Sequence, residues 1–383
     1  MKSILFVHQS AELYGSDKTL LLLLKHINKQ KFCPIVVLPN DGPLKKELEK
    51  ENIEVFITPV IKLHRKMFTP TNLLLLLNHF RQGFSTLNKL HKKYRFEIIY
   101  SNTLAVLIGF LFARIKGIKH IWHVHEIIES PKLVSKIFSF LISRRSNFFT
   151  IYNSKATAIF WESFFGERKN YIIVSNGLEI QSNNITTNEI ELIRKKMFEV
   201  EDEIVIGLVG RINRWKGQFM LLEAFNDLIK KHSNLKLIFV GSTTDNQQHI
   251  INELNSKIQK YQIEKNVKII PFQSNINTIW KAIDIAVVPS IEPEPFGLVA
   301  VEAMLASKPV VASNHGGLTE IIDHQQTGFL IEPNNIQELI NAIEKLINDK
   351  KLRLDMGQKG YKRAAEEFSI QKHVSKIEKV LAD

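Results

Sequence analysis

Two glutamates, Glu294 and Glu302, are separated by seven residues. The residues around them predict a loop at Glu294 and a helix at Glu302. Pro293 and Pro295 disfavour helix at Glu294, because proline fixes its own φ and restricts the residue before it. The run 296–306 has no proline and repeats apolar residues at helical spacing, which places Glu302 in about the second turn of a helix. Unpaired amides at a helix N-terminus suit a phosphate, and the flanking carboxylates can accept hydrogen bonds from hydroxyls. The spacing predicts a site for a nucleotide-diphosphate sugar, although glutamate more often lies on a solvated surface.

Two cations follow a buried strand earlier in the chain. The apolar run 204–209 is typical of such a strand, and Gly210, Arg211 and Lys216 come after it, before an amphipathic helix that reaches Lys231. Arginine can bind a phosphate through two hydrogen bonds, and lysine supplies a compact positive charge. Together they could stabilise the charge that builds on a departing diphosphate. On their own, both side chains are equally well explained as surface residues of a loop.

A pair of histidines ends a predicted strand in the first half of the chain. Strand alternation in Trp122-His-Val-His-Glu126 puts His123 and His125 on one face. Open α/β sheets bind ligands at the carboxyl ends of their strands, so these side chains are candidates for a site. Two nitrogens without a third ligand at a familiar spacing do not predict zinc. On the pattern alone, a buried and hydrogen-bonded histidine is the commoner explanation of His125.

A glycine-containing loop, 11–18, follows the first predicted strand and leads into a leucine-rich helix expected over 19–25. Gly15 could let the backbone approach a ligand closely, and Ser16 could contact that ligand. A plain turn in which Asp17 caps the helix explains the same residues as well.

Strand-like apolar runs alternate with helical patterns, and these elements must position the candidate residues. Such alternation is typical of doubly wound parallel sheets, so we predict an α/β chain with two Rossmann-like domains. The polar, aperiodic stretch 176–188 is predicted to be the linker. The predicted strands are 4–7, 35–38, 55–58, 98–100, 121–124 and 148–152 in the first half, and 204–209, 237–240, 267–270, 285–288, 310–312 and 329–331 in the second.

Length and composition agree with two domains. The chain has 383 residues, more than one hydrophobic core usually serves, and 44% of them are hydrophobic. Cys33 is the one cysteine, so no intramolecular disulfide can form, which fits a reducing cytosol. No run reaches the ~18 apolar residues of a membrane span, and 104–113 is predicted to be a buried helix. The run 1–7 is predicted to be a first strand, because its apolar part is too short for a signal peptide.

Positive charge is concentrated in the first half. Residues 1–180 contain 26 Lys and Arg against 13 Asp and Glu, whereas the remainder contains 25 against 26. A basic surface beside apolar stretches such as 73–77 and 137–142 would suit an anionic bilayer and an acceptor carried on a lipid. Nucleic-acid binding is an alternative, but the chain has no zinc-finger spacing, aromatic RNA-binding signature or basic recognition helix. The clustered basic residues are Lys62, Arg65 and Lys66, then Lys89, Lys92, Lys93 and Arg95, and finally Arg144 and Arg145.

Together these residues resemble the large retaining glycosyltransferase family with two Rossmann domains, family 4, which includes relatives of glycogen synthase and phosphatidylinositol mannosyltransferase. The strongest match runs from Pro289-Ser290 through Glu294-Pro-Phe-Gly-Leu-Val-Ala-Val-Glu302, which contains the family's two glutamates separated by seven residues. The resemblance extends over nearly the whole chain. Further matching positions are Gly210-Arg211 with Lys216-Gly217, Asn176-Gly177, Gly316-Gly317 with Glu320, and Thr327-Gly328-Phe329.

The resemblance implies the GT-B fold, in which two Rossmann-like domains face a cleft. The domain 1–180, joined by a final helix 368–383, would bind the acceptor, and the domain 189–367 would bind the nucleotide sugar. Arg211 and Lys216 would hold the donor diphosphate. Glu302 would hold the ribose, and Glu294 and His125 would contact the transferred sugar. The other implied donor contacts are Gly15, Ser16, Gly210, Phe272, Phe296, Gly297, Leu298 and Val299.

The implied reaction moves a hexosyl group to a hydroxyl of a glycan or lipid-linked acceptor with retained configuration, in bacterial surface-polysaccharide synthesis. The chain has no Asp-x-Asp dyad, so side-chain cations rather than a metal are expected to hold the diphosphate, and no cofactor is expected. We expect a cytoplasmic protein, peripheral at the inner face of the cell membrane. The alternatives are a basic protein that binds nucleic acid or a membrane surface, and an epimerase or phosphorylase of the same fold. The form of the segment 293–302 favours the transferase.

Overall fold

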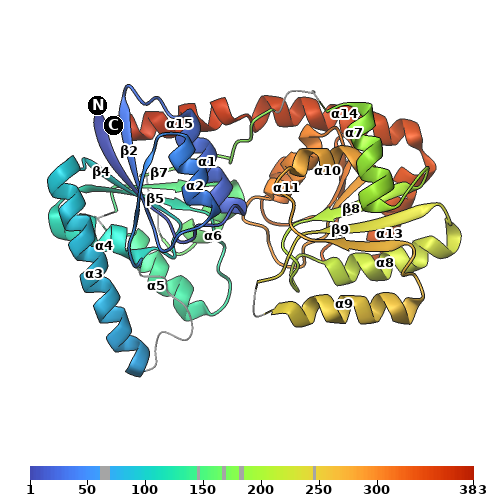
Figure 1. Ribbon diagram of the computed structural model, residues 1–383, viewed down its shortest axis with the longest axis horizontal. Helices are drawn as coiled ribbons and strands as arrows, with labels where there is room; N and C mark the ends of the chain where they lie inside the picture. Colours follow the sequence, from blue (N-terminus) through green and yellow to red (C-terminus); the bar gives the residue numbers. More distant parts are fainter. Residues whose placement is uncertain (61–69, 145–146, 166–169, 181–184, 245–246) are drawn as a thin grey trace. The chain divides into compact units, whose positions relative to one another are not determined.

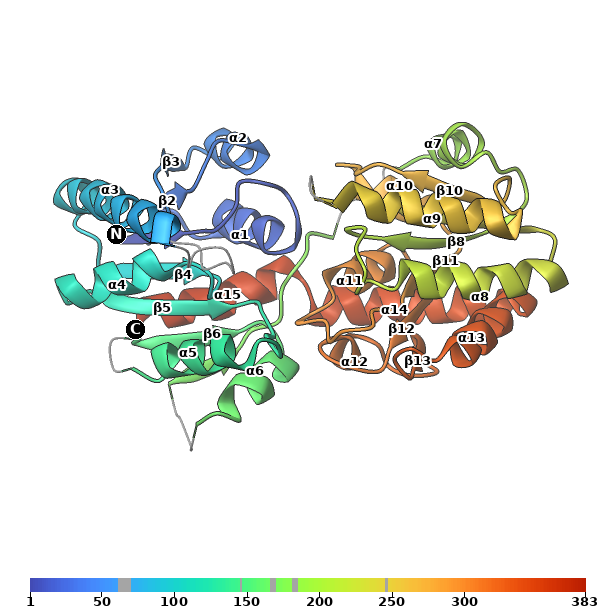
Figure 2. The same cartoon turned by 90° about the horizontal axis from the view of Figure 1, so that it is seen from below.

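The computed structural model describes residues 1–60, 70–144, 147–165, 170–180, 185–244 and 247–383, and for residues 70–74 the backbone alone. The chain divides into two compact units. Unit 1 comprises Met1–Glu179 and Ile370–Asp383, and unit 2 comprises Ile180–Ser369. Each unit is built on one parallel sheet with helices on both faces (Figures 1 and 2).

Unit 1 has a seven-stranded sheet in the order β3-β2-β1-β4-β5-β6-β7. Its strands are β1 (Lys2–Val7), β2 (Phe32–Leu38), β3 (Glu54–Ile57), β4 (Ile98–Asn102), β5 (Lys119–Val124), β6 (Phe149–Tyr152) and β7 (Tyr171–Ile173). Its helices are α1 (Gly15–His26), α2 (Pro43–Lys50), α3 (Pro70–Tyr94), α4 (Leu107–Lys116), α5 (Lys132–Ile142), α6 (Lys155–Glu162) and α15 (Ile370–Ala382). Helices α3, α4 and α5 cover one face of the sheet, and α1, α2 and α15 cover the other (Figure 1).

Unit 2 has a six-stranded sheet in the order β10-β9-β8-β11-β12-β13. Its strands are β8 (Ile204–Val209), β9 (Leu235–Val240), β10 (Val267–Ile270), β11 (Ile285–Val288), β12 (Val310–Ser313) and β13 (Gly328–Ile331). Its helices are α7 (Thr187–Leu192), which continues into a π-helical turn (Ile193–Phe198), α8 (Gln218–Lys231), α9 (Gln248–Tyr261), α10 (Ile276–Ala282), α11 (Leu298–Leu305), α12 (Leu318–Ile321), α13 (Ile336–Asn348) and α14 (Lys350–Glu367).

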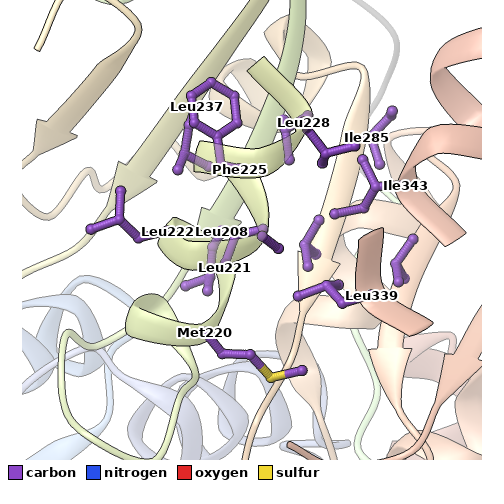
Figure 3. Packing of buried hydrophobic residues seen from close by; sticks show 14 of the residues in the cluster. Leu208, Met220, Leu221, Leu222, Phe225, Leu228, Leu237, Ile285, Leu339 and Ile343 are labelled. Carbon is purple, nitrogen blue, oxygen red and sulfur yellow. The ribbon is translucent and has the colours of Figure 1, made fainter. Parts of the chain in front are cut away.

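The core of unit 2 packs α8 and α13 against the sheet, as Figure 3 shows. Leu221, Phe225 and Leu228 recur at helical spacing along α8 and are fully buried. They share one cluster with Leu237 of β9 and Ile343 of α13. Truncating such a side chain typically costs about 2–5 kcal/mol. This packing fixes α8 against β8, and the loop between these two elements carries three of the predicted site residues, Gly210, Arg211 and Lys216.

The predicted α/β architecture is confirmed, and each predicted strand is a strand of the structure with ends shifted by at most a few residues. Parallel strands buried on both faces carry near-continuous apolar runs, which made them recognisable. Strand β7 was not predicted, because its three residues are too few to show a pattern. Part of the predicted linker, residues 181–184, lies outside the described residues.

The prediction that the leucine-rich helix of unit 1 begins at residue 19 is wrong. Helix α1 begins at Gly15, so Gly15, Ser16 and Asp17 form its first turn. The Asp17 carboxylate accepts a hydrogen bond from the main-chain amide of Tyr14 at 3.2 Å, which caps the helix at this earlier point. A Cβ at Gly15 would meet no atom within 4 Å, so packing does not require glycine there.

The helix predicted over 104–113 instead begins at Leu107. The residues before Leu107 are held by side chains from β5 and from the loop that follows β5. Trp122 donates its indole hydrogen to the carbonyl oxygen of Thr103 at 2.9 Å, and the amide of Leu104 donates to Oε2 of Glu126 at 3.2 Å. These bonds replace helical ones and delay the start of α4.

Helix α15 carries the end of the chain and packs on α1 in unit 1. Ile370, Val374, Ile377 and Leu381 are buried at helical spacing. Glu378 accepts a hydrogen bond from the main-chain amide of Asn28 at 2.7 Å, beyond the end of α1. Among the described helices, none has the length and apolar content to cross a bilayer.

Candidate active site

A lysine and a glutamate from two loops of unit 2 form a buried ion pair. Nζ of Lys216, before α8, lies 2.6 Å from Oε1 of Glu294, in the loop before α11. The side chains are 15% and 5% exposed, so little water screens their charges. Ser290 donates its hydroxyl hydrogen to the same carboxylate oxygen at 2.6 Å. Oε2 of Glu294 and the other ammonium hydrogens of Lys216 are then the groups that can face a ligand.

Two glycines let the loops around this pair pack closely. Gly217 has a φ of +81°, and a Cβ there would lie 2.0 Å from the carbonyl oxygen of Pro289. Gly316 has a φ of +59°, and a Cβ there would lie 2.3 Å from the carbonyl oxygen of Glu294. Glycine adopts such φ values without steric cost. The amide of Gly317 donates to the same carbonyl of Glu294 at 2.7 Å, so the backbone of Glu294 is held in place.

The second glutamate, Glu302, lies in the second turn of α11, as predicted. The indole Nε1 of Trp280, a buried residue of α10, lies 3.4 Å from its Oε2 and donates a hydrogen bond to it. A buried tryptophan usually finds such a partner for its N–H. Trp280 therefore restricts the orientation of the Glu302 carboxylate, which the sequence predicts to hold the ribose.

Four predicted donor contacts lie at the N-terminus of α11, where main-chain amides are available to an anion. Gly297 is the N-cap residue, and Leu298 and Val299 open the helix. Phe296 is buried against Phe368 of unit 2, with ring centroids 5.8 Å apart. The segment between the two glutamates thus combines a helix N-terminus, which would suit a phosphate, with a fixed hydrophobic support.

The remaining predicted contacts of unit 2 follow its parallel strands at the same edge of the sheet. Gly210 and Arg211 come directly after β8. The side-chain amide nitrogen of buried Gln218 donates to the main-chain carbonyl of Arg211 at 3.0 Å, which fixes the loop that also carries Lys216. Phe272 follows β10, and its main-chain amide donates to Oγ of Ser242 at 3.1 Å.

In unit 1, a chain of polar contacts joins α1 to the ends of three neighbouring strands. Nε2 of His8, after β1, lies 2.7 Å from Oδ1 of Asp17. Nδ1 of His8 lies 3.1 Å from the side-chain amide nitrogen of Asn102, at the end of β4. Oδ1 of Asn102 in turn lies 3.2 Å from Nε2 of His125, after β5. The amide nitrogen of Asn102 also lies 3.4 Å from the carbonyl oxygen of Ser16. The predicted site residues Ser16 and His125 are thereby connected.

Burial keeps His123, His125 and His373 neutral by lowering their pKa values. Loss of hydration lowers the pKa of His125 to about 3, with smaller contributions from His8 and His373. The rings of His123 and His125 lie 4.0 Å apart between centroids, which confirms the predicted common face. Burial also lowers the pKa of His123 well below its usual value and that of His373, on α15, to about 4. A neutral imidazole can both donate and accept one hydrogen bond, which suits contact with hydroxyls.

Glu126 supports the main chain beside His125. Its Oε2 accepts hydrogen bonds from the amide of His125 at 3.0 Å and from that of Leu104 at 3.2 Å. Burial raises the pKa of this carboxyl to about 7, although these backbone donors act in the opposite direction. Glu126 therefore ties the segment after β5 to the segment after β4.

Sequence patterns identified neither Asn102 nor the partnership of His8 with Asp17. Both His8 and Asn102 come at the carboxyl ends of predicted strands, and that position was the available signal. The contribution of His373 carried no local signal, because its contact with the carbonyl of Ser175 at 2.9 Å joins residues 198 positions apart. Among the described residues, no group of three or more His, Cys, Asp or Glu is arranged to hold a metal ion.

Residues 189–363 match the family model described as glycosyl transferases group 1. Over 198 residues the chain is 31% identical to the capsular polysaccharide biosynthesis glycosyltransferase CapM of Staphylococcus aureus, an alignment that covers 51% of this chain and 50% of that protein. The chain thus spans about half the length of that relative.

Two further comparisons extend over the whole chain. It is 23% identical over 380 residues to the UDP-Gal:alpha-D-GlcNAc-diphosphoundecaprenol alpha-1,3-galactosyltransferase of Escherichia coli, covering 97% of this chain and 94% of that one. The crystal structure of HepE from Anabaena in complex with UDP-glucose superposes with a TM-score of 0.87 at 27% identity, covering 100% of both chains.

Proposed function

We propose that this chain, whose residues 189–363 match the model of glycosyl transferases group 1, moves a hexosyl group from a nucleotide-diphosphate sugar to a hydroxyl of a glycan or lipid-linked acceptor, with retained configuration. The observation that carries this proposal is the buried pair of Lys216 and Glu294 before α11. It combines a cation suited to a diphosphate with a carboxylate suited to sugar hydroxyls, at a helix N-terminus suited to phosphate.

Each charged group has one role in the proposed donor complex. Lys216 and Arg211 stabilise the negative charge that develops on the departing diphosphate. Glu294 accepts hydrogen bonds from hydroxyls of the transferred sugar, and Glu302 accepts them from the ribose. The bond from the anomeric carbon to the diphosphate breaks, a bond to the acceptor oxygen forms on the same face, and the acceptor proton passes to the leaving phosphate. His125 contacts a hydroxyl of the transferred sugar.

UDP-sugars are the first donors to test. The names of two similar proteins support this choice, since one transfers galactose from UDP-Gal and the other was crystallised with UDP-glucose. CapM acts in capsular polysaccharide biosynthesis, and the galactosyltransferase acts on a diphosphoundecaprenol-linked sugar. These names support a bacterial polysaccharide or a lipid-linked intermediate as the acceptor class.

Binding of UDP-glucose, UDP-galactose, UDP-N-acetylglucosamine and GDP-mannose, measured by calorimetry and thermal shift, tests the donor site. One nucleotide class should raise the unfolding temperature, and Glu302→Ala should weaken that binding. Glu264→Ala is the matched control, because Glu264 is an exposed glutamate in a turn of the same unit. If no nucleotide binds, or if Glu302→Ala binds as tightly as the wild type, the assigned donor site is wrong.

We further propose that α5 contacts an anionic membrane surface that carries the acceptor. Leu133, Ile137 and Phe140 are 68%, 39% and 54% exposed and form one stripe along the helix. The exposed cations Lys132, Lys136 and Arg144 accompany this stripe, and the helix contains no acidic residue. The guanidinium carbon of Arg144 lies 3.7 Å from the ring centroid of Phe140. Apolar side chains beside cations fit an anionic bilayer interface, whereas a second copy of α5 would bring like charges together.

The other basic residues predicted for this surface are only partly described. Lys89, Lys92 and Lys93 lie near the end of α3, and Arg95 follows that helix. Lys62, Arg65, Lys66 and Arg145 lie outside the described residues.

Flotation with phosphatidylglycerol vesicles tests the membrane contact. The wild type should float at about 0.1 M salt and be released at about 1 M, where the screening length falls from ~10 Å to ~3 Å. Ile137→Ala with Phe140→Ala should abolish flotation, whereas Leu354→Ala, which removes a similarly exposed leucine of α14, should not. Equal flotation of the α5 variant would assign the contact elsewhere.

A further inference from the structure

The orientation of the Asn102 side chain follows from one neighbour that can only accept hydrogen bonds. The carbonyl oxygen of Ser16 lies 3.4 Å from one end of the Asn102 amide, and that end is assigned as the nitrogen because an amide oxygen there would face a second acceptor. The same nitrogen lies 3.1 Å from Nδ1 of His8. The amide oxygen therefore occupies the opposite end, 3.2 Å from Nε2 of His125.

This orientation fixes the proton on His125. An amide oxygen can only accept, so Nε2 of His125 must carry the hydrogen of the contact. A neutral imidazole has one protonated nitrogen, which leaves the lone pair on Nδ1. Burial lowers the pKa of His125 to about 3, so the ring is neutral at physiological pH and the choice between its two tautomers is real.

We propose that Asn102 is a positioning residue that holds His125 in the Nε2–H tautomer, so that Nδ1 accepts a hydrogen bond from a hydroxyl of the bound sugar. The role of Nδ1 rests on the proposed transferase function, whereas the tautomer follows from the contacts of unit 1 alone.

Asp17 and His8 support the amide from the other side. Both are buried, and Nε2 of His8 lies 2.7 Å from the Asp17 carboxylate, which must accept the hydrogen. In the neutral ring Nδ1 of His8 is then unprotonated and accepts a hydrogen bond from the side-chain amide nitrogen of Asn102 at 3.1 Å. The main-chain carbonyl oxygen of Asn102 lies 3.0 Å from the same Nδ1, but it is also an acceptor and forms no hydrogen bond with the unprotonated nitrogen. Ser10 also donates to Asp17 at 2.6 Å. Reversal of the amide would set its oxygen against two acceptors, Nδ1 of His8 and the carbonyl of Ser16, so these two contacts hold its orientation.

Nuclear magnetic resonance of protein labelled with 15N in the histidine rings reads the tautomer directly and needs no substrate. We expect His125, assigned by its loss in His125→Gln, to show a protonated Nε2 and an unprotonated Nδ1 at neutral pH. In Asn102→Ala the preference should be lost, whereas Asn102→Asp keeps an acceptor and should retain Nε2–H. An Nδ1–H tautomer in the wild type would overturn the proposal, as would an unchanged tautomer in Asn102→Ala. The wild-type spectrum alone shows whether His125 is in the Nε2–H tautomer, even if a variant fails to fold.

Kinetics with the donor found in the binding screen test the consequence for transfer. Asn102→Ala should lower kcat by on the order of 10-fold to 100-fold, the size of loss known for partners that orient metal-binding histidines, with less effect on KM for the donor. Asn102→Asp should recover part of that loss. If Asn102→Asp loses as much kcat as Asn102→Ala does, the positioning role of Asn102 is contradicted. If no sugar is transferred by the wild type, the proposed function fails while the tautomer result stands.

Discussion

The ammonium of Lys216 and the carboxylate of Glu294 lie 2.6 Å apart where little water reaches them. At the scale of residues, the stability of each charged side chain therefore depends on the presence of the other. Removing one member of a buried pair leaves an uncompensated charge and typically costs about 3–5 kcal/mol, whereas replacing both members with apolar groups is often neutral. The contributions of the pair to stability and to function can therefore be separated.

We expect Lys216→Ala and Glu294→Ala each to lower the free energy of unfolding by about 3 kcal/mol. The double variant Lys216→Met, Glu294→Leu should regain most of that loss, because it removes both charges and retains volume. Denaturant titration measures the stability, and transfer assays should find all three variants inactive. Wild-type activity in the double variant would contradict the assignment of these charges to the donor.

Arg211 and Lys216 are both assigned to the leaving diphosphate, so their joint removal should act on the transition state. We expect Arg211→Ala with Lys216→Ala to depress kcat by more than 100-fold, since a single donor to developing charge is often worth about 10²–10³. The KM for an uncharged acceptor should change little. Steady-state kinetics with a varied acceptor measure both quantities, and equal turnover would refute the phosphate assignment.

At the scale of elements, sequence patterns identified those strands and helices whose residues show a local pattern of apolar residues and prolines. Buried parallel strands have continuous apolar runs, and the prolines around Glu294 separate its loop from the helix that carries Glu302. The start of α1 was missed because it depends on the Asp17 carboxylate, which also contacts His8 and Ser10. Asn102 was missed because its role depends on residues from α1 and β5, which no periodicity connects.

Helix α15 should contribute to the stability of unit 1 through its buried face. Ile377 is fully buried there, and Ile377→Ala should cost about 2–5 kcal/mol. Lys379→Ala, on the exposed face, is the matched control and should change stability by less than about 0.5 kcal/mol. Hydrogen exchange should locate the loss in unit 1. An equal loss of protection in both units would show that the two units unfold together, and would contradict the assignment of this effect to unit 1.

At the scale of the whole molecule, the buried histidines are distributed unevenly. The described histidines with lowered pKa values are His91, His120, His123, His125 and His373, and all of them lie in unit 1. The described carboxyls with lowered pKa values in unit 2 include Glu199, Glu203, Glu253 and Glu344. These two sets of groups respond to different ranges of pH.

Unit 1 should lose stability on acidification before unit 2. The folded pKa values of His120 and His125 are about 3 and that of His373 is about 4, below the ordinary 6.5, so their contribution is present above pH 6.5 and is lost as pH falls. Glu126, with a pKa raised to about 7 from 4.5, acts in the opposite direction but is one group against several. The carboxyls of unit 2 lose their contribution only below about pH 4.5. Hydrogen exchange at pH 7 and pH 5 should show faster opening of unit 1 peptides, and faster opening of unit 2 would contradict this account.

The division of unit 1 between the two ends of the chain affects the order in which the protein can fold on the ribosome. Residues 1–179 leave the exit tunnel before unit 2, but the face of α1 that packs on α15 awaits that helix, which is translated after unit 2. Unit 2 is continuous in sequence and can fold while that final helix is still being made, since domains generally fold as units during synthesis. Unit 1 therefore begins to emerge before unit 2 but is completed after it, and the apolar surface that α15 will cover is what a chaperone would encounter on the nascent chain.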